Sequence, residues 1–109
     1  MQKDEKILGE MLAVIERRAL GDPATSYTAR LYAKGVHKIA QKVGEEAVET
    51  AVAAVAESNE RLARESADLL YHLLILWHAK GITPGEVWAE LEHRFGTSGP
   101  AIKEIRKKS

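Results

Sequence analysis

Two consecutive stretches of this chain, residues 36–58 and 60–80, repeat apolar side chains with the period of a helix and are apolar around most of their circumference. No stretch alternates apolar and polar residues as a half-buried strand does. Helices this apolar need protein cover on most sides, and the rest of a 109-residue chain supplies little of it. We therefore expect one all-α domain over residues 1–109, a bundle of four to five helices that is completed by homodimerisation.

Shorter segments are predicted to complete the bundle. A helix over residues 4–20 ends at Gly21-Asp22-Pro23, and residues 24–35 form a loop or a short helix. Thr83-Pro84-Gly85-Glu86 combines a cap, a first-turn proline and a capping-box acid, which predicts the start of a further helix that Gly96 ends. A short basic helix is expected from about residue 98.

Composition excludes several classes of protein. The formal net charge is zero, so neither nucleic acid nor an anionic membrane is an expected partner. There is no cysteine, which removes disulfides, thiolate catalysis and cysteine-bound zinc. The longest apolar run, residues 69–77, is far shorter than the roughly 20 residues that span a bilayer, and the N-terminus resembles no signal peptide. We expect a cytoplasmic protein.

Carboxylates recur at a spacing of three residues on both long helices, as Glu46 and Glu49 on the first and Glu65 and Asp68 on the second. This spacing brings each pair to one helix face. Four or five carboxylates that converge between two helices, Glu45 included, repel one another unless a cation lies among them. Mg²⁺ is the natural cation for such oxygen ligands, which suggests a metal-dependent enzyme acting on phosphates.

An acidic stripe is more commonly a solvated helix face, but the neighbours of these acids argue against that reading. The face that carries Glu65 continues through Leu69 and His72, so we expect Glu65 and Asp68 to be buried. Buried carboxylates need compensation to remain charged. The histidines do not offer a zinc or di-iron site instead, because their spacing on the helices does not bring two of them to one ion.

Basic residues flank the acids. Lys38 and Lys42 precede them on the same helix, where Lys42 is positioned either to pair with Glu46 or, together with Lys38, to hold phosphate oxygens. The tail carries further cations, which either solubilise the chain end or close over an anionic ligand. No motif for a side-chain nucleophile is present, so the chemistry is expected to come from metal and water.

Several motifs together resemble the phosphoribosyl-ATP pyrophosphatase family. They are Ser26-Tyr27-Thr28-Ala29, Lys42-Val43-Gly44-Glu45-Glu46-Ala47-Val48-Glu49 and Ala67-Asp68-Leu69-Leu70-Tyr71-His72. The acidic pattern alone is shared with all MazG-like nucleotide pyrophosphatases. The resemblance implies a MazG-like all-α homodimer that hydrolyses phosphoribosyl-ATP to phosphoribosyl-AMP and pyrophosphate with Mg²⁺, the second step of histidine biosynthesis. The tail departs from the family pattern at Ile102.

The resemblance also implies roles for individual residues. It places the metal ligands at Glu46, Glu49, Glu65 and Asp68, with Glu45 as a further ligand or the base that activates water. Cations that steady the leaving pyrophosphate, and residues that select the substrate, would come from the segment before the acidic helix, from the start of that helix and from the tail. That set is Lys38, Lys42, Arg30, Lys34, Tyr27, Thr28, Lys103 and Arg106.

Some alternatives stay open at this point. Either one or two Mg²⁺ ions, and attack at either the α or the β phosphorus, fit the sequence. A general nucleoside-triphosphate pyrophosphatase of the house-cleaning type would keep the same acids but use ATP, dCTP or dUTP. A non-catalytic helical dimerisation module would keep the apolar helices without needing acids among them.

Overall fold

The computed structural model describes residues 6–96 and, within them, consists of five helices with no strand. They are α1 (Lys6–Ala19), α2 (Tyr27–Lys34), α3 (Val36–Ala56), α4 (Asn59–Ala79) and α5 (Pro84–Gly96). The all-α prediction is confirmed. The predicted roles of Lys103 and Arg106, and the predicted short basic helix in the tail, lie outside the described residues. None of the helices in the described range is both long and apolar enough to cross a membrane.

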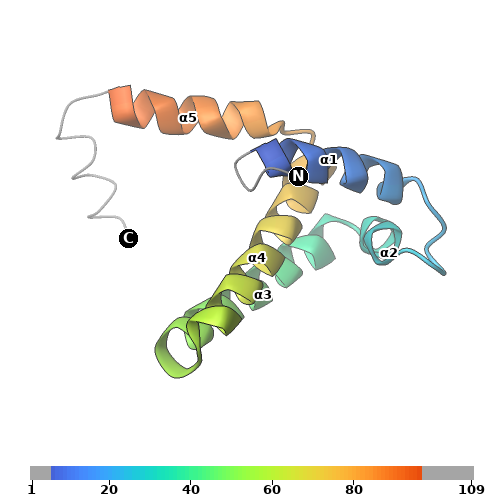
Figure 1. Ribbon diagram of the computed structural model, residues 1–109. Coiled ribbons are helices and arrows are strands. Elements are labelled where there is room, and N and C mark those ends of the chain that lie inside the picture. Colours follow the sequence, from blue (N-terminus) through green and yellow to red (C-terminus); the bar gives the residue numbers. More distant parts are fainter. Residues whose placement is uncertain (1–5, 97–109) are drawn as a thin grey trace.

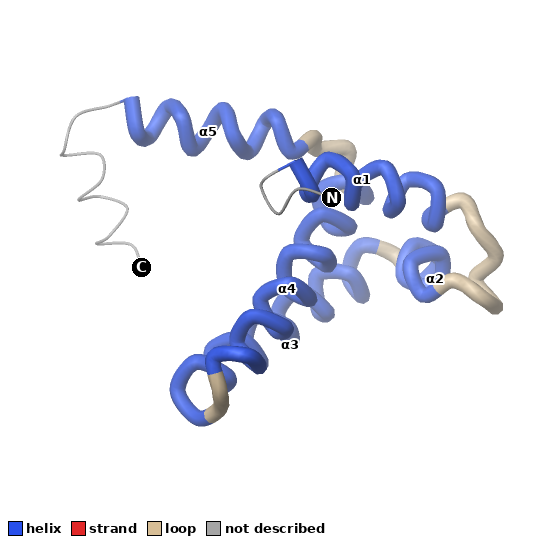
Figure 2. Tube along the Cα trace, viewed as in Figure 1, coloured by secondary structure: helices blue, strands red, loops and turns tan. Residues whose placement is uncertain are grey.

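Helices α3 and α4, the two longest helices, form an antiparallel hairpin (Figure 1). Their connection is short because Ser58 serves as the N-cap of α4, accepting a hydrogen bond of 3.1 Å from the Arg61 amide. This cap explains why α3 ends at Ala56 and not at residue 58 as predicted. Figure 2 shows α1 and α2 lying against the end of this hairpin that is farther from the Ser58 turn.

The segment before α3, left open between loop and helix, is the helix α2. Its N-cap is Ser26, whose hydroxyl accepts from the Ala29 amide at 3.2 Å. Gly35 ends α2 and begins α3 with φ of +95°, a conformation that favours glycine. Only eight residues long, α2 is too short to show a helical period in the sequence.

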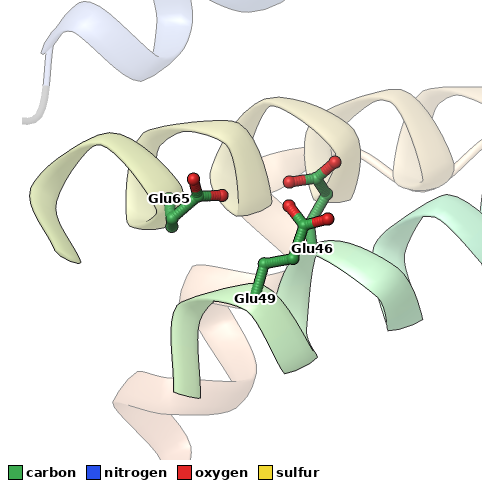
Figure 3. A group of neighbouring side chains, drawn as sticks. All are labelled: Glu46, Glu49 and Glu65. Atoms are coloured by element: carbon green, nitrogen blue, oxygen red, sulfur yellow. The ribbon is translucent and has the colours of Figure 1, made fainter. Parts of the chain in front are cut away.

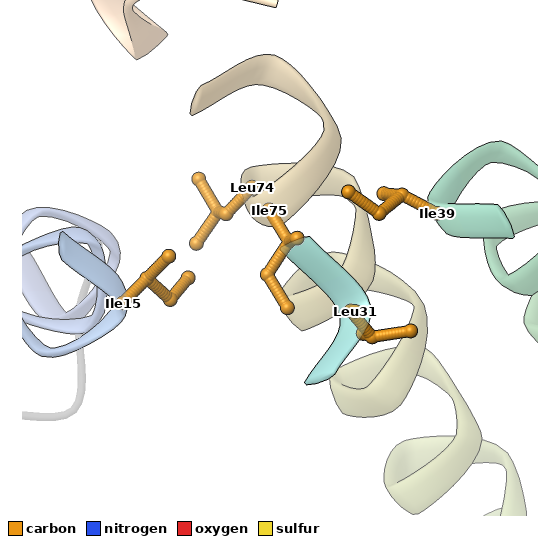
Figure 4. Close-up of a cluster of buried hydrophobic side chains, with 5 residues drawn as sticks. All are labelled: Ile15, Leu31, Ile39, Leu74 and Ile75. Atoms are coloured by element: carbon orange, nitrogen blue, oxygen red, sulfur yellow. The ribbon is translucent and has the colours of Figure 1, made fainter. Parts of the chain in front are cut away.

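A small apolar core holds α1, α2 and the α3–α4 hairpin together. Figure 4 shows side chains from all four helices meeting in it, and they are Ile15, Leu31, Ile39, Leu74 and Ile75. Each is at most 3% exposed. Burial of such side chains contributes roughly 1.5–3 kcal/mol each, which makes this cluster the main force that fixes α2 beside the hairpin.

Helix α5 begins as predicted but projects away from the other helices (Figure 1). The Thr83 hydroxyl lies 3.3 Å from the Glu86 amide, and the Glu86 carboxylate accepts from the Thr83 amide at 2.8 Å, which forms the capping box. Trp88 meets Trp77 of α4 edge to face, with ring centroids 6.0 Å apart. Farther along α5, Phe95 is 75% exposed, so this helix leaves apolar surface uncovered.

Candidate active site

Three carboxylates from the two long helices converge on the face where α3 meets α4. One oxygen from each of Glu46, Glu49 and Glu65 lies within 4.8 Å of the others (Figure 3), and we call these residues the acid group. Glu46 and Glu65 are buried, each about 7% exposed, whereas Glu49 is exposed. The helical spacing therefore predicted correctly that these acids from separate helices would meet.

Each buried carboxylate has one oxygen near a cation and one without a partner. Arg61 donates to Glu65 Oε1 at 3.0 Å, and Lys42 Nζ lies 3.7 Å from Glu46 Oε1. Glu46 Oε2 and Glu65 Oε2 are buried and accept no hydrogen bond from the described residues. A buried carboxylate oxygen without a partner is costly, so this arrangement fits a cation that binds between the acids.

The electrostatics of Glu65 point the same way. Burial raises the pKa of its carboxyl group, the neighbouring Glu49 carboxyl group raises it further, and the Arg61 guanidinium opposes the shift. The negative charge of Asp68 also raises it. Burial and neighbouring charge thus disfavour the ionised form of Glu65, and a divalent cation beside it would favour that form.

Asp68 differs from the prediction. We expected it to be buried beside Glu65, but it is exposed and is not part of the acid group. It follows Glu65 by three residues on α4, yet Glu65 is buried and Asp68 is exposed. Its charge is nevertheless close enough to Glu65 to raise the pKa there.

Glu45 and the lysines of α3 form a charged strip beside the acid group. Lys42 Nζ lies 3.3 Å from Glu45, and the Gln41 amide donates to Glu45 at 2.8 Å. These two hydrogen bonds hold the pKa of Glu45 below its usual value, with a smaller contribution from the charge of Lys38. The Lys42 ammonium group therefore lies between the carboxylates of Glu45 and Glu46.

The remaining cations predicted on α2 do not join this strip. Arg30 is exposed, and its guanidinium donates to the Pro23 carbonyl at 3.0 Å. Lys34 is exposed in the last turn of α2. The described structure gives neither side chain a contact with the acid group.

Tyr27 and Thr28, by contrast, form hydrogen bonds with side chains of α4. The Tyr27 hydroxyl lies 2.7 Å from His72 Nε2, and its pKa is raised by burial, with effects from the charges of Lys42 and Glu46. His72 Nδ1 lies 2.7 Å from the Asp68 backbone carbonyl, which can only accept, so Nδ1 carries the proton and Nε2 accepts from Tyr27. Thr28 is buried and bonds to the Tyr71 hydroxyl at 2.6 Å.

Sequence reasoning missed the residues that support the acid group. Thr50 joins the backbones of the two long helices at the site, Arg61 pairs with Glu65, and His72 orients Tyr27. Two of these carry a signal in the sequence, because Arg61 precedes Glu65 by one turn and His72 lies on the face of α4 that bears Glu65. Thr50 on its own carries none.

A hollow of about 310 Å³ opens onto the acid group from solvent. Its lining includes Glu49 and Glu65 of the acid group and the cation Arg61, and is completed by Val48, Val52 and Glu57. A helical hairpin whose clustered carboxylates border an open hollow offers the oxygen ligands that divalent cations bind in phosphate hydrolases.

Comparison with known proteins specifies the family. Residues 8–95 match the model of the family described as phosphoribosyl-ATP pyrophosphohydrolase. A phosphoribosyl-ATP pyrophosphatase of Paramagnetospirillum magneticum is 56% identical over 99% of both chains. One from Rhodospirillum rubrum is 56% identical over 94% of this chain and 88% of its own, and one from Pyrobaculum islandicum is 54% identical over 83% and 96%. The chain belongs to the phosphoribosyl-ATP pyrophosphohydrolase family.

Proposed function

We propose that this chain hydrolyses phosphoribosyl-ATP to phosphoribosyl-AMP and pyrophosphate with Mg²⁺, as the second step of histidine biosynthesis. Family membership over residues 8–95 supports the reaction. The observation that carries the proposal is the acid group, where two buried carboxylates each keep an oxygen without a partner. Hard oxygen ligands at this density suit Mg²⁺ and its phosphate ligands.

The metal would be held by Glu46, Glu49 and Glu65, with Asp68 completing the set from the solvent side of α4. Bound there, Mg²⁺ supplies positive charge that neutralises the phosphate oxygens as negative charge develops on them. The rest of the reaction depends on the chain's own residues, which orient the polyphosphate and remove a proton from the attacking water.

Lys42 and Lys38 are the proposed phosphate-binding cations, since Lys42 already lies at the edge of the acid group. Glu45 is the proposed base. In the absence of substrate, Gln41 and Lys42 hold its pKa low, which makes it a poor proton acceptor. When Lys42 turns to the phosphate oxygens, Glu45 loses one of these two hydrogen bonds and becomes a stronger base.

The proposed assembly is a homodimer, and α3 supplies the argument. Val48, Val52 and Val55 are 63%, 44% and 87% exposed on this helix. Its alanines are small, and at Gly44 an added Cβ would meet nothing within 4 Å in this chain. These exposed valines are apolar surface of the kind that packs against a second copy, and because Val48 and Val52 also line the hollow at the acid group, that copy would border the site.

A substrate panel tests the proposed reaction. Phosphoribosyl-ATP should be hydrolysed to phosphoribosyl-AMP and pyrophosphate far faster than ATP, dCTP or dUTP, and EDTA should abolish the reaction until Mg²⁺ is restored. Equal or faster turnover of the ordinary triphosphates would instead indicate a general nucleotide pyrophosphatase. Turnover that persists in excess chelator would contradict the metal-dependent mechanism.

A further inference from the structure

A second hollow lies where α1, α2 and α4 meet, and the acid group does not line it. It has a volume of about 440 Å³ and is lined by Arg18, Thr25, Ser26, Tyr27, Thr28 and Tyr71. Five of these six residues carry a hydroxyl group and the sixth carries a guanidinium. No carboxylate lines it, although acidic residues are as numerous as basic ones in the whole chain.

The Arg18 guanidinium is available to a ligand. Its one hydrogen bond among the described residues is a long one, 3.4 Å to the Tyr71 hydroxyl. Arg61, Arg64 and Arg94 each pair with a glutamate on their own helix, but Arg18 pairs with no carboxylate in the described range. A guanidinium presents paired N–H donors at the spacing of two phosphate oxygens, so it favours a phosphate over other anions.

The hydroxyl groups around Arg18 are held in place by the fold. Thr28 and Tyr71 bond to each other at 2.6 Å, and Ser26 donates to the Arg18 backbone carbonyl at 3.3 Å. The second bond ties the end of α1 to the start of α2. The walls of the hollow are therefore set before any ligand arrives, which reduces the entropy lost on binding.

Tyr27 connects this hollow to the acid group. It lines the hollow, its hydroxyl lies 2.7 Å from His72 Nε2, and His72 Nδ1 in turn lies 2.7 Å from the backbone carbonyl of Asp68, one turn from Glu65. A ligand in the hollow would consequently lie next to a ligand on the acid group, with the Tyr27 side chain between them.

We propose that this hollow, the Arg18 pocket, binds a phosphate monoester that belongs to the same substrate whose polyphosphate lies on the acid group. The inference rests on the proposed function. Phosphoribosyl-ATP carries a triphosphate on one ribose and a single phosphate on the other, whereas ATP has only the triphosphate. The Arg18 pocket then explains discrimination against ATP, because only the larger nucleotide has a group to fill it.

The test replaces Arg18 and uses its neighbour as a control. Arg18→Gln should raise the KM for phosphoribosyl-ATP about ten- to hundredfold, the range for one charge-assisted hydrogen bond, and change kcat much less. Arg18→Lys should recover part of the affinity. Arg17→Gln, an exposed arginine on the same helix that does not line the pocket, should behave as the wild type. Ribose 5-phosphate should inhibit the wild type competitively and Arg18→Gln hardly at all.

Each other outcome has a separate meaning. If the wild type hydrolyses phosphoribosyl-ATP and Arg18→Gln leaves its KM unchanged, the pocket proposal is wrong and the proposed function stands. If the wild type does not hydrolyse phosphoribosyl-ATP, the proposed function itself fails. Inhibition by ribose 5-phosphate or inorganic phosphate that is noncompetitive with the substrate would mean that the pocket binds a free phosphate compound, which overturns the assignment to the substrate.

Discussion

Thr50 on α3 lies 3.1 Å from the backbone carbonyl of Glu65 on α4, a hydrogen bond that joins the two long helices at the acid group. The same hydroxyl lies 2.7 Å from the carbonyl of Glu46, so its single proton is shared between the two acceptors. The side chains of Glu46 and Glu65 start from the backbone positions that Thr50 ties together. Their separation therefore depends on this residue, although Thr50 is not one of the proposed metal ligands.

Replacing Thr50 by valine tests this relationship. Valine keeps the shape and removes the hydroxyl, so the free energy of unfolding should fall by roughly 0.5–1.5 kcal/mol, the usual net value of a hydrogen bond. More Mg²⁺ should be needed to reach half-maximal activity, because the acids are less well fixed. Urea unfolding and Mg²⁺ titration measure the two effects. Thr50→Ser, which retains the hydroxyl, should keep the wild-type Mg²⁺ requirement, and an equal loss in both variants would contradict the idea.

Glu49→Gln should reduce the rate without disturbing the fold. Glutamine preserves the shape of this exposed side chain but removes the charge that a metal ligand needs. Hydrolysis should fall by orders of magnitude while circular dichroism stays helical. Glu10→Gln, an exposed acid on α1, is the matched control and should leave the rate unchanged. A Glu49 variant with more than about a tenth of the wild-type rate, a barrier change below roughly 1.4 kcal/mol, would remove Glu49 from the metal site.

The raised pKa of Glu65 predicts how the stability of the metal-free protein depends on pH. A folded-state pKa above the usual 4.5 means that the folded protein holds this proton more tightly than the unfolded chain does. The resulting stabilisation is present below pH 4.5 and is lost as the pH rises through the raised value. Glu65→Gln carries no such proton, so in EDTA the wild type should lose stability relative to this variant over that pH range.

Urea unfolding of the two proteins at a series of pH values, with EDTA, measures this difference directly. Added Mg²⁺ should reverse the order above the raised pKa, since it binds the folded wild type and finds one ligand fewer in Glu65→Gln. Parallel stability curves in EDTA would mean that Glu65 titrates normally in the fold. The absence of any Mg²⁺ effect on the wild type would show that the acids are solvated without a metal.

Much of the fold is predictable from local chemistry. Thr83, Pro84 and Glu86 mark the start of α5 by capping alone, and the spacing of Glu46, Glu49 and Glu65 places three acids on facing sides of two helices. The capping signal and the shared face of Glu46 and Glu49 need only the geometry of a single helix. That Glu65 faces them depends in addition on the antiparallel packing of α3 and α4.

The exposure of Asp68 and the existence of the Arg18 pocket could not be predicted from the sequence, because both depend on how the helices pack. Spacing places Asp68 one turn from Glu65, but only the position of α3 decides that Glu65 is covered and Asp68 exposed. The Arg18 pocket is a clearer case, because Arg18 and Tyr71 are 53 residues apart in the chain and no motif spacing relates them. Arg18 and Tyr71 meet because the buried core packs α1 and α2 against α4.

The last prediction concerns the homodimer and the exposed face of α3. The chain mass is 12.0 kDa, and light scattering at micromolar concentration should give about twice that value. Val55 is 87% exposed near the end of α3, and Val55→Lys should shift the mass toward the monomer because a charge would be buried between the two copies.

Leu20 provides a matched control for that substitution. It is 90% exposed and follows the last residue of α1, so Leu20→Lys makes the same chemical change at an equally exposed site away from α3. This variant should remain dimeric. A wild-type mass near that of a single chain would rule out the dimer. A dimer that survives Val55→Lys but not Leu20→Lys would place the interface on the other side of the molecule, because a lysine disrupts association only where its charge loses contact with water.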